Sequence, residues 1–386
     1  MPDKAFLNPD ILKWARISAR MTIESASSKI PVSADKLLEW EAGEAFPTIR
    51  QAKILANAYR RPFAMLFLPE IPLDFQLIQD FRMKGSRELS TSSVFLIRDI
   101  QQKQAWISEV LADNNEEKLP FVGRFNYNCD PKIVASNILE TLNINPGAYK
   151  TTNVLLEWVN TAESNGIFIS MTSFLHSRLK LDSEEIQGFA IADEYAPFIF
   201  INTEDWKAAQ LFSLVHELVH IWIAKTGISN VSELALNNKS VFLPVELFCN
   251  EVAANVLLPD YLFKEIPSVT FNNIAEIYKV SKKYGVSSFP LLIRALDLKI
   301  INIKEYNHLK AEAEIKYNEY LKIKQTKKKS DNHPDYYLLH LYRNGKLFTQ
   351  TVLDAFKGGH IESNLASSLL NIQINKFNKL EAQLYK

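Results

Sequence analysis

The sequence predicts an α+β protein with an all-α N-terminal domain, a central α+β domain and a small, mostly helical C-terminal region. Three observations support this fold class. Apolar residues recur at helical spacing in short segments of residues 1–70. An apolar helix at 211–223 contains two histidines and a glutamate, and helical patterns return after residue 300. The strands of the central domain follow from a resemblance described below.

Residues 1–70 are predicted to form four or five short helices. Apolar residues at helical spacing occur in ILKWARISARMT, ESASSKI, SADKLLEWEAGE and TIRQAKILANAYRR, and Gly43 and Pro47 mark breaks. The stretch E-W-E-A-G-E-A-F-P-T resembles the segment after the recognition helix of XRE-type helix-turn-helix repressors. The resemblance implies that the helix at 33–41 would enter the major groove of DNA.

The helix at 33–41 carries few of the side chains that usually contact DNA. Asp35, Glu39 and Glu41 would approach phosphates, and only Lys36 opposes them. Residues 1–70 contain ten basic and eight acidic residues, which is far from a strongly basic surface. DNA binding through Lys36 therefore stays open beside docking to a protein, such as another repressor.

A linking segment is predicted at residues 71–119. Within it, residues 85–114 are expected to form one long helix, because apolar side chains recur from Val94 to Leu111 at helical spacing. The polar sequence EEKLP that follows marks a boundary, and the central domain is predicted to span residues 120–300, with a helix at 131–143.

The segment LFSLVHELVHIWI, residues 211–223, contains the strongest chemical signal. His216 and His220 are four residues apart, so both imidazoles project from one helix face and can share one ion. Glu217 follows His216 and is rotated from it by about one helical step. In this position a carboxylate can act on a metal-bound water and not on the metal itself. This H-E-x-x-H arrangement is typical of zinc peptidases, in which the metal activates water and the glutamate takes its proton. The alternative is a buried helix whose histidines bond to neighbours.

A third metal ligand is expected, because catalytic zinc usually has three protein ligands. Ile223 and Thr226 exclude an extended motif with a third histidine. The helix VELFCNEVAANVLLPD, residues 245–260, offers Glu246, with Asn250 on the same face and Glu251 turned toward solvent. Glu246 could equally be an ordinary first-turn acid of that helix. Cys249, in the same helix, is interpreted as a small buried apolar residue.

The two segments together resemble the ImmA/IrrE-type metallopeptidases, in which HExxH precedes a helix of the form E-x-x-[AC]-N-x-[FV]-A-A-x-x-L-x-P. The resemblance extends to GIFIS (166–170), QGFAIAD (187–193) and PFIFIN (197–202), which look like that family's strands. It implies a zincin-like α+β domain with Zn²⁺ bound by His216, His220 and Glu246, and with Glu217 as general base. His176 and Tyr195 are weak candidates for a transition-state proton donor.

The remaining chain carries no assigned chemistry. Residues 301–335 are predicted to be a charged helix, 304–325, and a linker in which Lys327–Lys329 is solvated. Residues 336–386 form the C-terminal region, with a strand-like YYLLHLY followed by helical stretches at 347–356 and 362–385.

Composition limits the function classes. The net charge is zero, so no general attraction to nucleic acid or anionic membranes is expected. The start lacks an apolar signal core and no apolar stretch reaches membrane-spanning length, so a soluble, cytoplasmic protein is expected.

The motif, the family resemblance and the composition together predict an intracellular zinc-dependent endopeptidase. Its protein substrate would be a regulatory protein, such as a helix-turn-helix repressor, as the resemblance implies for phage, mobile-element or stress responses. The alternative is a non-enzymatic XRE-type transcription regulator, or an antitoxin-like protein, with a structural or sensing zinc site. A closed structural site needs a fourth protein ligand, and Cys249 is the only Cys or His in its helix, which favours an open catalytic site.

Overall fold

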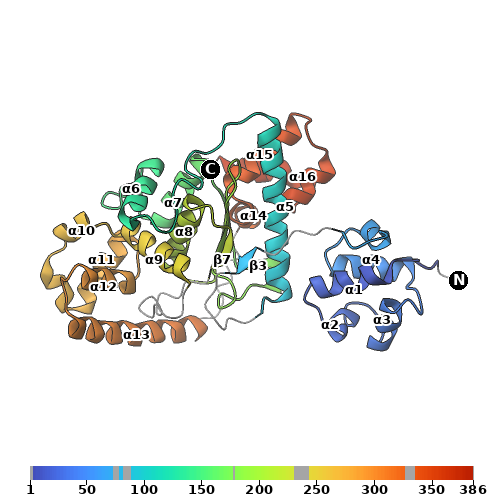
Figure 1. The fold of residues 1–386 in the computed structure, drawn as a ribbon, viewed down its shortest axis with the longest axis horizontal. Coiled ribbons are helices and arrows are strands. Elements are labelled where there is room, and N and C mark those ends of the chain that lie inside the picture. Colours follow the sequence, from blue (N-terminus) through green and yellow to red (C-terminus); the bar gives the residue numbers. More distant parts are fainter. Residues whose placement is uncertain are drawn as a thin grey trace. The chain divides into compact units, whose positions relative to one another are not determined.

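The computed structural model describes residues 3–72, 78–80, 88–176, 179–229, 243–326 and 335–385 (Figure 1). The chain divides into two compact units. Among the described residues, the first unit holds 3–72 and 88–101 together with 175–176 and 179–180, and the second holds the rest. Each unit is described in turn.

The first unit is all-α in its N-terminal part. The four helical segments predicted there are helices, and a side-chain oxygen of the preceding polar residue caps each of them. A short 3-10 helix, η1, follows. The bounds are α1 (Pro9–Ser18), α2 (Ile23–Ser27), α3 (Ala34–Glu41), α4 (Ile49–Ala58) and η1 (Phe63–Phe67).

A buried ion pair joins α1 to α3. Arg16 donates from Nε to Glu41 Oε1 at 2.7 Å and from Nη2 to Glu41 Oε2 at 2.9 Å. The expectation that Glu41 would approach phosphates is therefore wrong, because its carboxylate faces the interior. The exposed part of α3 presents Leu38, which is 49% exposed, and an ion pair between Lys36 and Glu39.

The long helix α5 (Thr91–Asp113) confirms the helix predicted in the linking segment, but it begins later than residue 85. The Ser90 hydroxyl accepts a hydrogen bond from the Ser93 N–H at 3.4 Å and marks the start of the helix. The boundary between the two units falls within this helix, after residue 101.

A small mixed sheet lies at the centre of the second unit. Its strand order is β1-β7-β5-β6-β2, in which β2 is parallel to β6, β1 is parallel to β7, and β5 is antiparallel to both of its neighbours. The three predicted strands correspond to β2, β5 and β6. The bounds are β1 (Gln79–Asp80), β2 (Phe168–Thr172), β5 (Gly188–Ile191), β6 (Phe198–Asn202) and β7 (Gly227–Ser229), with β3 (Phe174–His176) and β4 (Leu179–Lys180) in a separate two-stranded sheet.

Helices cover both faces of the central sheet, so strands β2, β5 and β6 are buried along their whole length. On one face, Ile169, Ile199 and Ile201 belong to the main core with α8 (Lys207–Trp222). On the other face, Phe168 and Phe198 contact Phe348, with ring centroids 6.4 and 6.2 Å apart. Helix α9 (Pro244–Leu257) packs beside α8, as Figure 1 shows in yellow and yellow-green, and α6 (Pro131–Leu142) and α7 (Val154–Ser164) complete this side.

The rest of the described chain is helical. The segment YYLLHLY, predicted as strand-like, is instead part of a helix, because the Asp335 carboxylate caps it by accepting the Tyr337 and Leu338 N–H groups at 2.7 and 3.1 Å. The predicted helix 362–385 is interrupted at Asn371, where φ is 57°. Lys327–Lys329 lies outside the described residues. The bounds are α10 (Asp260–Glu265), η3 (Ser268–Asn272), α11 (Ile274–Tyr284), α12 (Ser288–Asp297), α13 (Ile303–Thr326), α14 (Tyr336–Asn344), α15 (Lys346–Lys357), α16 (Ser363–Leu370), η4 (Ile374–Lys376) and α17 (Phe377–Leu384).

Among the helices that the structure describes, none combines the length and the apolar character that a membrane span requires.

A buried carboxylate connects the C-terminal helices to the sheet domain. Glu163 at the end of α7 accepts the Leu347 N–H at 3.1 Å, at the start of α15. Gly345 precedes that turn with φ of 83°, and a Cβ there would lie 2.3 Å from the Ile169 carbonyl oxygen. Burial raises the pKa of Glu163 from 4.5 to about 7, although the N–H groups of Leu347 and Lys346 act in the opposite direction.

We predict that this carboxylate makes stability depend on pH. The folded pKa of about 7 lies above the ordinary value of 4.5, so the folded chain binds the proton more tightly. The contribution is full below pH 4.5 and is lost as pH rises through 7, by up to about 3 kcal/mol. Glu163→Gln keeps an acceptor without the charge, so its urea midpoint should exceed that of the wild type at pH 8 and match it near pH 4.5. The exposed Glu140→Gln is the control. Parallel pH profiles for wild type and Glu163→Gln would contradict this role.

Candidate active site and metal centre

The site is built on α8, a helix that is buried almost throughout. Residues Gln210 to Trp222 are all buried, because the helix lies between the sheet on one side and α6, α7 and α9 on the other. His216 and His220 are 0% exposed and Glu217 is 1% exposed. Ionisable side chains at such depth are stable only when other groups satisfy them.

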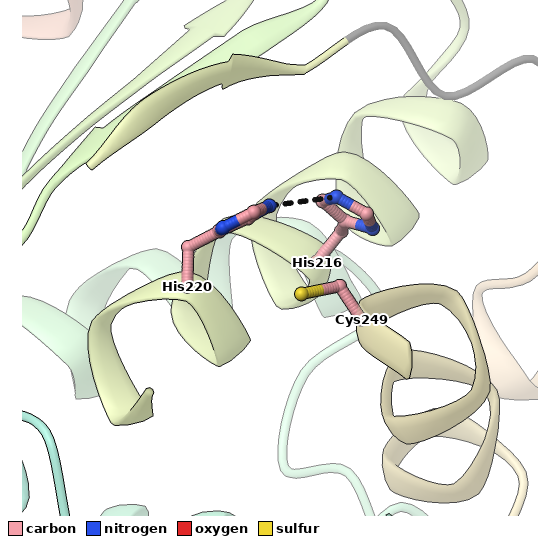
Figure 2. A group of neighbouring side chains, drawn as sticks. All are labelled: His216, His220 and Cys249. Atoms are coloured by element: carbon pink, nitrogen blue, oxygen red, sulfur yellow. Dashed lines mark hydrogen bonds between the residues drawn. The ribbon is translucent and has the colours of Figure 1, made fainter. Parts of the chain in front are cut away.

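Three predicted ligand residues meet at one point. Nε2 of His216 lies 3.2 Å from Nε2 of His220. The Glu246 carboxylate, from the first turn of α9, places Oε2 3.2 Å from His216 Nε2 and Oε1 3.1 Å from His220 Nε2. Figure 2 shows the two imidazoles of α8 turned toward one another.

These distances fit a divalent metal ion. Bonds of about 2.0–2.1 Å in a tetrahedron place neighbouring nitrogen and oxygen donors about 3.3 Å apart. The donor separations of 3.1 to 3.2 Å are close to this value. The alternative for the two histidines, hydrogen bonds to unrelated neighbours, does not explain why one carboxylate addresses both rings. The donor set of two imidazoles and one carboxylate is thus suited to a metal.

Charge and burial also couple the three side chains. Burial acts to raise the pKa of Glu246, but attraction and hydrogen bonds to His216 and His220 outweigh it and bring the pKa to about 2. Burial lowers the pKa of His220, and Glu246 only partly offsets this. The carboxylate is therefore ionised at neutral pH beside an imidazole that burial keeps neutral, which are the forms that bind a metal.

Glu217, the predicted general base, lies next to this cluster and not within it. Burial raises its pKa well above the ordinary value, the Glu246 charge raises it further, and a hydrogen bond to the Ser229 side chain lowers it. Its Oε2 has no hydrogen-bond partner among the described residues. An oxygen of this kind is available to take a proton from a substrate or water.

Two residues that the sequence did not single out shape this part of the site. Gly188 of β5 pairs in register with Ser229 of β7. A Cβ at Gly188 would lie 3.0 Å from Glu217 Oε1, so a glycine leaves room for the carboxylate. The Ser229 hydroxyl lies 3.2 Å from His220 Nε2. A glycine inside an apolar strand was a usable signal, whereas nothing in the sequence around Ser229 marked it.

The α9 helix holds three further polar residues near Glu246. Glu251 is exposed, as predicted. Asn250 is 8% exposed, and neither atom of its amide has a partner among the described residues. Cys249 is buried as predicted, but its sulfur is not in purely apolar surroundings. Its Sγ and one nitrogen each of His216 and His220 all lie within 4.8 Å of one another (Figure 2).

Two competing ligand sets therefore share the histidines, one with Glu246 and one with Cys249. The Glu246 oxygens lie 3.1 and 3.2 Å from the histidine Nε2 atoms, which matches the spacing of metal ligands. For the Cys249 sulfur, the distance to the histidine nitrogens has only an upper limit of 4.8 Å. On these distances Glu246 fits the third ligand position better than Cys249 does.

Of the remaining predicted residues, Tyr195 can be compared with the site directly. Tyr195 follows β5, and its ring lies 5.7 Å from the Lys118 ammonium. No contact found among the described side chains joins it to the histidines. The His176 side chain lies outside the described part of the chain. Lys36 belongs to the first unit, where its ammonium pairs with Glu39.

Comparison with known proteins agrees with this geometry. Among curated proteins, none matches the chain. Residues 162–295, which run from the end of α7 through β2, β5, β6, α8 and α9 to α12, match the family model of the IrrE N-terminal-like domain, Peptidase_M78. The match includes His216, Glu217, His220, Glu246 and Cys249 and supports a metallopeptidase-type function for this part of the chain.

Proposed function

We propose that this chain is a zinc-dependent endopeptidase that acts on a regulatory protein inside the cell. The observation that carries the proposal is the convergence of His216, His220 and Glu246 at 3.1 to 3.2 Å, with Glu217 buried beside them. Two imidazoles and one carboxylate are a ligand set that zinc uses in catalytic sites. The family match over residues 162–295 supports the peptidase class.

Each residue has a distinct role in this proposal. His216, His220 and Glu246 would hold the ion. Zinc, when bound, polarises the scissile carbonyl and makes a water more acidic. Glu217 would accept the proton of the attacking water at Oε2 and pass it to the leaving amine nitrogen. Gly188 leaves space for that carboxylate, and the Ser229 hydroxyl orients it.

The N-terminal helices are proposed to form an XRE-like domain that docks the protein substrate, with a helix-turn-helix repressor as the expected partner. The order of α1 to α4 supports the first part. The exposed surface of α3 supports docking over DNA reading, because Leu38 is 49% exposed and the Lys36 charge is paired with Glu39. A phosphate backbone attracts unpaired basic side chains, and α3 offers few.

A second function is favoured by one observation. The Cys249 sulfur beside the two histidines could complete a four-ligand zinc site. Such closed sites are typical of structural zinc. In that case the chain would be a transcription regulator or antitoxin-like protein with a metal-containing sensor domain.

The first prediction concerns the metal. Purified protein should contain about one zinc per chain, and Glu246→Ala should lose most of it, because two imidazoles alone bind zinc weakly. Atomic emission spectrometry after gel filtration measures the zinc content per chain. Glu251→Ala is the matched control, since that residue is exposed on the same helix. Full zinc retention by Glu246→Ala would move the third-ligand role to another residue, with Cys249 the nearest.

The second prediction separates an enzyme from a regulator. Glu217→Gln should keep zinc and fold but lower cleavage of repressor substrates at least about a hundredfold, because it removes the proton acceptor and leaves the ligands. The measurement is gel-based cleavage of candidate helix-turn-helix repressors with matched zinc contents. Equal cleavage by wild type and variant would exclude Glu217 as the base.

The third prediction concerns the N-terminal domain. Full-length protein should bind arbitrary duplex DNA with a dissociation constant of about 10 µM or weaker at physiological salt, and Lys36→Ala should change this little. Leu38→Asp should slow cleavage of the repressor but not of a short unstructured peptide, because only the repressor needs the docking surface. Gel-shift titration and cleavage kinetics test the two parts. Tight, sequence-specific binding that disappears in Lys36→Ala would show that the domain reads DNA.

A further inference from the structure

Cys249 occupies an unusual position for a buried cysteine. It follows Glu246 by three residues on α9, so both side chains point from the same side of that helix toward α8. The side chain is 0% exposed, and the cysteine forms no disulfide. Its sulfur lies within 4.8 Å of a nitrogen of each imidazole. Figure 2 shows it projecting from α9 below the histidine pair.

The remaining distance to a metal ligand position is small. Zinc bonds of about 2.3 Å to sulfur and about 2.0–2.1 Å to nitrogen place the two donors about 3.5 Å apart in a tetrahedron. The sulfur at no more than 4.8 Å must therefore approach the nitrogens by about 1.3 Å at most. A rotation about the Cα–Cβ bond moves a cysteine sulfur by more than this, so the size of the movement is within the reach of the side chain.

We propose that Cys249 is a fourth protein ligand that closes the coordination shell of the metal in the resting protein. The inference rests on the proposed zinc site of His216, His220 and Glu246. When the thiol binds the ion, the sulfur–hydrogen bond is replaced by a sulfur–zinc bond and the proton leaves to solvent. No electron is transferred, and no other reactant is needed.

A closed shell changes what the site can do. A tetrahedral ion has four positions, so a bound thiolate and a reactive water exclude each other. With Cys249 bound, Glu217 has no water to activate. Displacement of the sulfur, for example when a docked substrate shifts α9, opens the fourth position. The proposal thereby unites the two candidate functions, since the resting site has the ligand number of a structural centre and the opened site that of a peptidase.

The experiment uses full-length protein with Co²⁺ in place of zinc. Thiolate bound to Co²⁺ gives an intense charge-transfer band in the near ultraviolet, which nitrogen and oxygen ligands lack. We expect the band in the wild type and in Cys129→Ala, the matched control for the other cysteine, and expect it to be absent in Cys249→Ala and Cys249→Ser. A chelator competition should show metal affinity at least about tenfold lower in both Cys249 variants.

A second readout tests whether the shell is closed. Azide binds an open position on Co²⁺ and changes the visible spectrum. Its apparent affinity should be at least about tenfold higher in Cys249→Ala than in wild type or Cys129→Ala, because the sulfur no longer competes for that position. Circular dichroism of the variants confirms their folding, and the band in Cys129→Ala is decisive even if both Cys249 variants fail to fold.

The outcomes separate this inference from the proposed function. Wild-type protein that binds Co²⁺ without the charge-transfer band, and binds azide as tightly as Cys249→Ala, overturns the role of Cys249 and leaves the open peptidase site intact. Wild-type protein that binds neither Co²⁺ nor zinc overturns the metal site itself and this inference with it. A band that persists in Cys249→Ala but disappears in Cys129→Ala shows that Cys129 supplies the bound sulfur. This result also overturns the inference.

Discussion

The pairing of one α9 carboxylate with two α8 imidazoles is the interaction on which the site depends. Helix α8 is buried on nearly all sides, and His216, Glu217 and His220 are almost fully shielded from water. Glu246 brings one oxygen to Nε2 of each ring, so a single side chain contacts both histidines. It also joins α9 to α8, because a rotation of either helix would separate the carboxylate from the two rings. The chemistry and the packing of the two helices are thus set by the same contact.

The sheet has an equally specific relation to the site. The strands β5 and β7 run beneath α8, and their paired residues Gly188 and Ser229 lie against Glu217 and His220. A small residue and a hydroxyl at these two positions leave the carboxylate space and one hydrogen-bond donor. On the same face of β5, Ala190 belongs to the main core. The sheet therefore lines one side of the site and also packs against the helix that carries it.

Sequence predicted what depends on local spacing and missed what depends on contacts between distant segments. The positions of His216, His220 and Glu217 follow from helical periodicity, and the helix bearing Glu246 follows from its apolar pattern. The roles of Ser229 and of the Cys249 sulfur need the packing of β7 and α9, which no local pattern encodes. The same limit explains two errors. The carboxylate of Glu41 is bound by Arg16 twenty-five residues earlier, and YYLLHLY is helical because Asp335 caps it.

The packing of α15 on the aromatic face of the sheet limits which segment of this chain can be transferred to another protein by recombination. Phe348 covers Phe168 and Phe198, and the turn before it is anchored by Glu163. A segment cut to the family match alone, residues 162–295, would leave two phenylalanine rings facing water. Recombination that transfers the candidate site to another chain must therefore also transfer α15. Otherwise another apolar segment must cover Phe168 and Phe198. Helix α15 is therefore a part of the core, although it lies outside the family match.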